Sequence, residues 1–253
     1  MMPDDSINNA INWIAKYGKN DDILTFTIRN DVQLEPSVIK RVSLKIQGDE
    51  YMRTISLKSK GTLFLIEDGG TVILGKNVTL KGISGNNSPL LVIDSNKLIM
   101  EAGSIIRDNT NLSGAAGIYI SLNASFIMNG GEISNNITNN GNGGGVYVRG
   151  SFRMNEGIIS GNTADLGGGV YCAVYKSPYT GTTYYGYFFK PNTGGIIYGS
   201  NEGNTALRNV SSNGNNGGHA VYFPTNPIKK RNTTVGATDI LDSTINGTSG
   251  GWE

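Results

Sequence analysis

Short stretches in which apolar and polar residues alternate recur along the chain, and most of them fall into three series that repeat at nearly constant intervals. Each stretch is a few residues long, and Gly or Asn residues separate it from the next. This pattern is typical of short β-strands joined by tight turns, because side chains in a strand point alternately to its two sides. The three series are Lys97–Met100, Ser125–Met128 and Ser151–Met154; Gly117–Ile120, Gly145–Val148, Gly169–Cys172 and Ala220–Phe223; and Ile106–Asn109, Ile133–Asn136 and Ile159–Asn162.

One repeat contains three such strands and no segment of helical length, which predicts one coil of a three-sided solenoid. Strands of neighbouring coils would pair in parallel about 4.8 Å apart and bury their inward side chains together. The expected fold class is all-β, a single-stranded right-handed parallel β-helix with three strands per coil, and its handedness follows from that of parallel crossovers in general. The expected inward positions are Phe126, Met128, Ile133, Val146, Val148, Phe152, Met154, Ile159 and Cys172.

The chain is predicted to form a single β-helix domain, residues 1–253, with a cap at each end, because an open solenoid would expose strand edges. Asp5 and Ser6 can cap a short helix in which Ile7 and Ala10 fall at helical spacing. The expected segments are an N-terminal helical cap at 1–20, an irregular first coil at 21–60, regular coils at 61–223 with a Tyr-rich insertion at 173–187, and an irregular C-terminal cap at 224–253.

Asn residues recur at one turn of the repeat. Asn109, Asn136 and Asn162 follow one another at intervals of one repeat each. Identical side chains stacked in register can hydrogen-bond along a stack, so we predict a structural Asn ladder. An ion-binding turn is the alternative, but oxygen-ligand metal sites usually contain several carboxylates, which this turn lacks.

Composition narrows the function classes. The chain has 36 Gly, 7 Pro and a formal net charge of +1, and its longest basic run is Lys229 to Arg231, so no nucleic-acid partner is expected. No apolar stretch reaches the roughly 20 residues of a membrane-spanning helix. Residues 1–6 show no secretory leader, although removal of a leader would leave the same start. Cys172 is the only cysteine, so no internal disulfide can form.

Two motifs carry a resemblance to a known family. Met128 to Asn136 reads Met-x-x-Gly-x-Ile-x-x-Asn, and Gly143 to Val148 reads Gly-Gly-Gly-Val-Tyr-Val. Over residues 60 to 253 the chain resembles bacterial right-handed β-helix repeat proteins of the pectin-lyase-like superfold, in particular uncharacterised surface repeat proteins of spirochaetes such as treponemes. The resemblance implies a cell-surface or secreted location and an adhesive role, and it brings no catalytic residues with it.

Many members of that superfold cleave acidic polysaccharides, so the resemblance raises an enzymatic alternative. In lyases that resemble this fold, a cluster of Asp residues holds calcium beside an Arg base. The hydrolases use two or three Asp residues on neighbouring coils. Glu67 and Asp94 follow equivalent strands one repeat apart and are the candidate catalytic pair. The next positions of that column are Ser121, Arg149 and Ala173, so we interpret both carboxylates as solvated turn residues.

Two smaller features have a chemical and a structural interpretation. Lys81 and Arg107 are expected to stack as a basic pair that could contact an acidic sugar or lie in solvent. His219 is the only His and has no Cys, Ser or carboxylate motif beside it, so a structural role is favoured.

An outward column of side chains is the best candidate for a binding surface. Outward aromatic rings can stack on sugars or contact a protein, and they can also simply pack across the sheet. The insertion at 173–187 places further Tyr among Ser, Gly and Thr, which suits adaptable contacts, or it could fold over the column as a lid. The column comprises Leu65, Val92, Tyr119, Tyr147 and Tyr171, and the insertion adds Tyr179, Tyr184 and Tyr185 as candidate ligand-binding residues.

These patterns lead to one expected function and two alternatives. The expected function is a non-enzymatic, surface or secreted β-helix module that binds a glycan or a host or cell-surface protein through its Tyr residues. A polysaccharide lyase or hydrolase using Glu67 and Asp94 is the first alternative, and a structural spacer is the second. Neither a cofactor nor a metal is expected, and the chain is predicted to be a monomer or a module of a larger protein.

Overall fold

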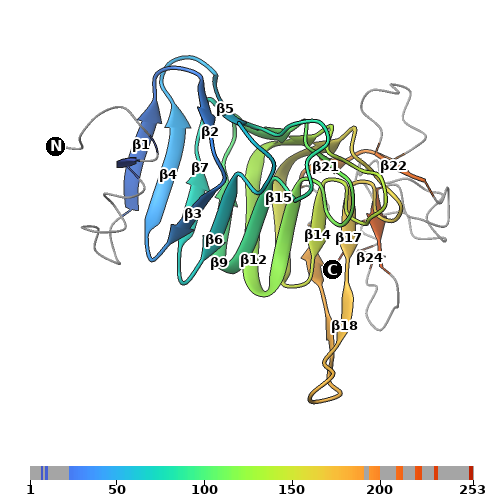
Figure 1. The fold of residues 1–253 in the computed structure, drawn as a ribbon. Coiled ribbons are helices and arrows are strands. Elements are labelled where there is room, and N and C mark those ends of the chain that lie inside the picture. The colour runs from blue at the N-terminus through green and yellow to red at the C-terminus, as the bar shows by residue number, and fades with distance from the viewer. Residues whose placement is uncertain are drawn as a thin grey trace.

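The computed structural model of the chain describes Ile7, Asn9, Ala10 and residues 23–190, 194–199, 209–212, 220–223, 231–232 and 251–252. Within this part the chain forms a parallel β-helix, in which short strands from successive coils lie side by side (Figure 1). The expected all-β solenoid is therefore confirmed. The described residues contain no helix that is long and apolar enough to cross a membrane.

Three columns of parallel strands make up the main sheet, and strands one coil apart pair in parallel. The first column contains β3 (Ser37–Lys40), β6 (Phe64–Glu67), the start of β9 (Leu91–Met100), the start of β12 (Ile118–Ser134), β14 (Val146–Val148), β17 (Val170–Cys172) and β23 (Val221–Tyr222).

The other two columns follow the first around each coil, so β9, β12 and β15 continue past a corner from one column into the next. The second column contains β1 (Ile23–Ile28), β4 (Ser43–Gly48), β7 (Thr71–Leu74), the end of β9, the middle of β12, the start of β15 (Ser151–Ser160) and β20 (Tyr187–Phe189). The third contains β2 (Val32–Leu34), β5 (Arg53–Leu57), β8 (Val78–Lys81), β10 (Ser104–Arg107), the ends of β12 and β15, and β21 (Ile196–Ile197).

The two ends of the chain are described less completely. The expected helical cap lies outside the described residues except for Ile7, Asn9 and Ala10, and the side chains of Ile7 and Ala10 belong to the buried core. In the range 21–60, strands β1 to β5 already pair in the three columns of the later coils. Of residues 224–253, the structure describes the antiparallel pair of β24 (Arg231–Asn232) and β25 (Gly251–Trp252).

The interior is a continuous apolar stack along the solenoid. All nine expected inward side chains are buried, with exposed fractions of 0 to 2 %. Aromatic rings stack from coil to coil: the ring centroids of Phe126 and Phe152 are 4.7 Å apart, and those of Phe152 and Phe188 are 5.0 Å apart. The inward side chains of each coil pack against those of the coils on both sides, so the burial of apolar area stabilises the coils together and not one by one.

The predicted Asn ladder is confirmed. Oδ1 of Asn136 accepts the backbone amide of Asn109 at 3.2 Å, and Oδ1 of Asn162 accepts the amide of Asn136 at 2.9 Å. The same arrangement continues to Asn209, whose Oδ1 accepts the Asn162 amide at 3.0 Å, and Asn86 donates to Asn109 at the other end. All five side chains are completely buried, so the ladder supplies the polar partners that this corner needs away from water.

Two structural features accompany the ladder. A smaller parallel sheet follows it in each coil and consists of β11 (Thr110–Asn111), β13 (Ile137–Thr138), β16 (Thr163–Ala164) and β22 (Val210–Ser211). Gly145 lies where neighbouring coils approach closely: a Cβ there would be 2.6 Å from the carbonyl oxygen of Gly169 and 3.2 Å from Nδ2 of Asn162. The Gly-rich run before each Tyr-containing strand therefore lets the backbones meet beside the ladder.

Candidate functional site

The Tyr residues of the first column lie in register. Tyr119 of β12 pairs with Tyr147 of β14, which pairs with Tyr171 of β17. The column continues beyond the predicted positions to Tyr222 of β23. Ring centroids are 5.2 Å apart between Tyr119 and Tyr147, 4.9 Å between Tyr147 and Tyr171, and 5.6 Å between Tyr171 and Tyr222. Leu65 and Val92 precede the rings in the same column, as expected.

The column is less exposed than an open aromatic surface would be. Tyr171 is 9 % exposed, while Tyr119 and Tyr147 are half-buried. Part of the cover comes from a turn of the same coil, because a Cβ on Gly167 would lie 2.8 Å from Cα and Cβ of Tyr171. The rings thus pack against each other and against their own turns, and much of their area serves the sheet itself.

Two phenol groups of the column, those of Tyr147 and Tyr171, are held neutral. Burial raises the pKa of Tyr171 to about 12, and the neighbouring phenols of Tyr147 and Tyr222 add to this shift. The pKa of Tyr147 is also raised, first by burial and then by Tyr119, while Arg149 opposes the change. Neutral phenols can donate and accept hydrogen bonds but contribute no charge to a binding surface.

Arg149 connects the column to the Tyr-rich insertion. Its Nη1 donates a hydrogen bond to the hydroxyl of Tyr119 at 3.1 Å. Its guanidinium carbon lies 4.3 Å from the ring centroid of Tyr175, which is cation–π geometry. The pKa of Arg149 is raised, chiefly by the hydrogen bond to Tyr119, so the side chain is positively charged throughout the physiological range.

The insertion forms an antiparallel β-hairpin of β18 (Val174–Lys176) and β19 (Thr183–Tyr185). The hairpin projects away from the solenoid (Figure 1), so it does not fold over the Tyr column as a lid. Tyr175 and Tyr184 stack across its two strands with ring centroids 6.3 Å apart. Near the tip, Tyr179 is 95 % exposed.

The base of the hairpin is fixed to the preceding coil. The amide of Ala173 donates to the carbonyl oxygen of Val148 at 2.8 Å, and the amide of Tyr187 donates to that of Gly150 at 2.8 Å. Gly186 lies so close that an added Cβ would be 2.0 Å from the Val148 oxygen. These contacts place the hairpin strands beside the corner that carries Arg149.

A hollow of about 410 Å³ lies between the hairpin and two neighbouring corners of the solenoid. We call it the hairpin hollow. The hairpin contributes Tyr184 and Tyr185, which are 37 % and 48 % exposed. The solenoid contributes Leu122, Asn123, Ala124, Ser125, Arg149, Gly150 and Ser151. The hollow therefore combines aromatic rings with hydroxyl and amide groups and one cation.

The structure brings Glu67 and Asp94 into the expected column, since β6 and β9 pair through Ile66 and Ile93 immediately before them. Glu67 pairs with Lys40 on its other side, and Asp94 accepts a hydrogen bond from the hydroxyl of Ser121 at 3.0 Å. Neither carboxylate lines the hairpin hollow. Among the described residues there is no group of three or more His, Cys, Asp or Glu side chains that could hold a metal ion.

A second hollow of about 410 Å³ lies on the third column. Lys81 and Arg107, which pair in register as expected, line it together with Asp31, Thr54 and Ser56. The basic pair therefore faces a space that also contains a carboxylate. His219 lies outside the described residues.

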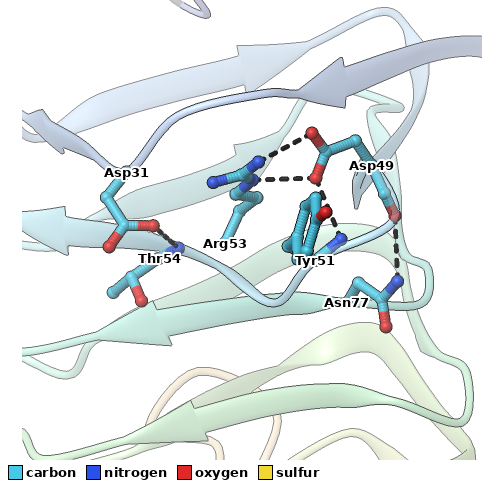
Figure 2. Close-up of polar contacts among 6 residues, drawn as sticks. All are labelled: Asp31, Asp49, Tyr51, Arg53, Thr54 and Asn77. Atoms are coloured by element: carbon cyan, nitrogen blue, oxygen red, sulfur yellow. Dashed lines mark hydrogen bonds and ion pairs between the residues drawn. The ribbon is translucent and has the colours of Figure 1, made fainter.

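The corner beside this second hollow is braced by a polar network, which Figure 2 shows. Nε and Nη2 of Arg53 donate to the two carboxylate oxygens of Asp49 at 2.8 Å each. The hydrogen bonds from Arg53, assisted by the backbone amide of Tyr51, hold the pKa of Asp49 at about 2. Asp31 accepts the backbone amide of Thr54 at 2.8 Å. These contacts position the backbone between β4 and β5.

Comparison with known proteins adds no relative. No protein-family model matches the chain, and no curated protein or solved structure matches it. The structure supports the parallel β-helix, while the relationship suggested by the repeat motifs stays a prediction.

Sequence reasoning finds the Tyr residues but misses most of their polar neighbours. It reaches Arg149 only as a position in the carboxylate column, and it does not reach Asn123, Ser125 or Ser151. The sequence does contain one indication that Arg149 lies near the insertion. Arg149 follows the strand that contains Tyr147, and Ala173, where the insertion begins, holds the same position in the next coil. The backbone pairing that fixes the hairpin beside these residues has no comparable signature in the sequence.

Proposed function

We propose that this chain is a non-enzymatic β-helix module, secreted or displayed at a cell surface, that binds a glycan in the hairpin hollow. One observation carries the proposal: Tyr184 and Tyr185 share a space of about 410 Å³ with the polar side chains of Asn123, Ser125 and Ser151. Sugars have apolar ring faces and hydroxyl-bearing edges, so a site for them combines aromatic rings with hydrogen-bonding groups.

The shape and exposure of the hollow support a saccharide ligand. Its volume falls in the range of roughly 300–1,000 Å³ that is usual for small-molecule sites. Tyr184 and Tyr185 remain accessible although both are large and partly apolar, and clustered exposure of this kind often marks a contact surface.

The chemistry of the lining supports binding over bond cleavage. Glycosidases of the usual type use a pair of carboxyl groups as acid and as base or nucleophile. None of the described residues that line the hairpin hollow carries a carboxyl group. The candidate pair Glu67 and Asp94 lies outside it, and Asp94 is engaged by Ser121.

The proposal includes a relationship to pectin-lyase-like β-helix repeat proteins of bacterial surfaces. The three-column parallel solenoid and the repeat motifs with their buried Asn ladder support it. Those motifs determine a fold and do not by themselves specify a role.

The test is a glycan array probed with the wild-type chain and with the double variant Tyr184→Ala/Tyr185→Ala. We expect the wild type to bind a defined set of glycans and the double variant to lose that binding. Tyr179→Ala is the matched control, because Tyr179 belongs to the same hairpin but does not line the hollow.

Besides absence of binding, two results would contradict the proposal. One is equal loss of binding in the control, which would show that the hairpin as a whole is required and the hollow is not. The other is release of shortened or unsaturated sugars from the bound glycans, followed by loss of this activity in Glu67→Gln, which would establish the enzymatic alternative.

A further inference from the structure

The charge that the described residues bring to the hairpin hollow is positive. Arg149 is the one charged residue among the described residues that line it. No Asp or Glu within the described part of the chain forms an ion pair with Arg149. The nearest carboxylate in its column is that of Asp94, two coils away, and the hydroxyl of Ser121 on the intervening coil binds it. An uncompensated cation in a hollow attracts an anionic group.

The guanidinium is also held in one orientation. The hydroxyl of Tyr119 occupies one of its N–H groups, and the ring of Tyr175 covers one face. A guanidinium has five N–H donors in a planar fork, so further donors are available for a ligand. Such a fork matches the two oxygens of a carboxylate or sulfate, and fixing it beforehand lowers the entropic cost of binding.

The second hollow provides an internal contrast. Its cations Lys81 and Arg107 share the space with the carboxylate of Asp31, which offsets part of their charge. The tyrosine rings of the hairpin hollow have no counterpart among the residues that line the second hollow. The combination of an unpaired cation with exposed aromatic rings therefore distinguishes the hairpin hollow.

We propose that the hairpin hollow selects acidic saccharides, with Arg149 binding the carboxylate or sulfate group and an aromatic ring of the hairpin edge, that of Tyr184 or Tyr185, packing against a sugar ring. This inference rests on the proposed glycan-binding function and names its ligand class. Asn123, Ser125 and Ser151 would then contact the hydroxyl groups of the same ligand.

The experiment uses an array of matched triplets in which one neutral oligosaccharide also appears in a carboxylated and a sulfated form, for example lactose, sialyllactose and sulfated lactose. We expect the wild type to bind at least one acidic form roughly tenfold more tightly than the neutral form, as a charge-assisted hydrogen bond would produce. The two acidic arms distinguish a carboxylate from a sulfate as the group recognised.

Arg149→Gln should reduce the affinity for the acidic form to that for the neutral form. Arg153→Gln is the matched control: Arg153 also lies over an aromatic ring, 4.5 Å from the Phe189 centroid, and also donates to a polar side chain, that of Asn155 at 2.8 Å, but it does not line the hollow. Rising salt concentration should reduce the difference in affinity between the acidic and the neutral glycan for the wild type. This tests the electrostatic contribution to binding without any substitution.

Equal binding of the neutral and acidic forms by the wild type, or a preference for the neutral form, would overturn the inference while leaving glycan binding intact. An acidic preference that Arg149→Gln retains would overturn it as well. Absence of binding to every glycan on the array would instead remove the proposed function, and the inference with it.

Discussion

The hydroxyl of Tyr119 accepts a hydrogen bond from Nη1 of Arg149 at 3.1 Å, across 30 residues of sequence. This contact joins two parts of the molecule that the repeat alone does not connect, namely the stacked Tyr column and the hollow beside the hairpin. Tyr119 therefore acts as a positioning residue for the cation.

Tyr119→Phe should weaken acidic-glycan binding about two- to twelvefold, because it removes one net hydrogen bond of about 0.5–1.5 kcal/mol while keeping the ring in the column. Isothermal titration of an acidic glycan and its neutral parent measures the effect. Binding of the neutral parent should change much less than binding of the acidic form. An equal change for both ligands would show that the hydroxyl supports the site in general and not the cation in particular.

Asn136→Ala should destabilise the solenoid strongly. The substitution leaves the buried amide of Asn109 without its acceptor, and such an unsatisfied buried group costs about 1–3 kcal/mol. It also removes the side-chain donor to Oδ1 of Asn162, although that oxygen keeps the backbone amide of residue 136. The free energy of unfolding in urea measures this loss. Asn140→Ala, at an exposed position in the same coil, should change it by less than about 0.5 kcal/mol. Similar losses for both variants would contradict the structural role of the ladder.

The contact between Asp49 and Arg53 should make stability depend on acid pH. The pKa of Asp49 is lowered from 3.8 to about 2, chiefly by Arg53, so the folded state binds this proton less readily than the unfolded state. The resulting stability is present above about pH 4 and disappears as the pH falls through about 2. Melting temperatures of wild type and Asp49→Asn should therefore differ at neutral pH and converge in this window.

Arg53→Gln provides the complementary measurement, since it removes the partner and should abolish the same pH-dependent difference. A gap between wild type and Asp49→Asn that stays constant down to pH of about 2 would show that the carboxylate contributes nothing through its charge.

The fold can be predicted because its determinants repeat at nearly constant intervals. Met128 and Met154, or Asn136 and Asn162, mark equivalent positions in neighbouring coils, and stacking follows from that spacing. The same reasoning misses the ladder residue Asn209, because it lies 47 residues after Asn162, beyond the reach of a regular period.

The hairpin hollow cannot be predicted from the sequence, for a different reason. It depends on backbone contacts across the insertion, such as that between Ala173 and Val148, and on which side of the solenoid the hairpin projects. Tyr composition signals a contact surface but does not specify the geometry of that surface. The exposure expected for the column is also too high, because Tyr171 lies between the rings of Tyr147 and Tyr222 and the turn at Gly167 adds cover that the alternating pattern does not describe.

The Asn ladder has a consequence for how such a chain can vary. The step from Asn136 to Asn162 contains 26 residues and the step from Asn162 to Asn209 contains 47, yet the amide-to-Oδ1 distances are 2.9 and 3.0 Å. Coil length and coil register are thus decoupled: the corner amides and the paired strands keep the spacing of the coils, and additional chain such as the hairpin leaves the stack elsewhere in the coil. The solenoid can serve as a display scaffold, on which segments grafted at the hairpin tip change what the surface presents while the pitch stays the same.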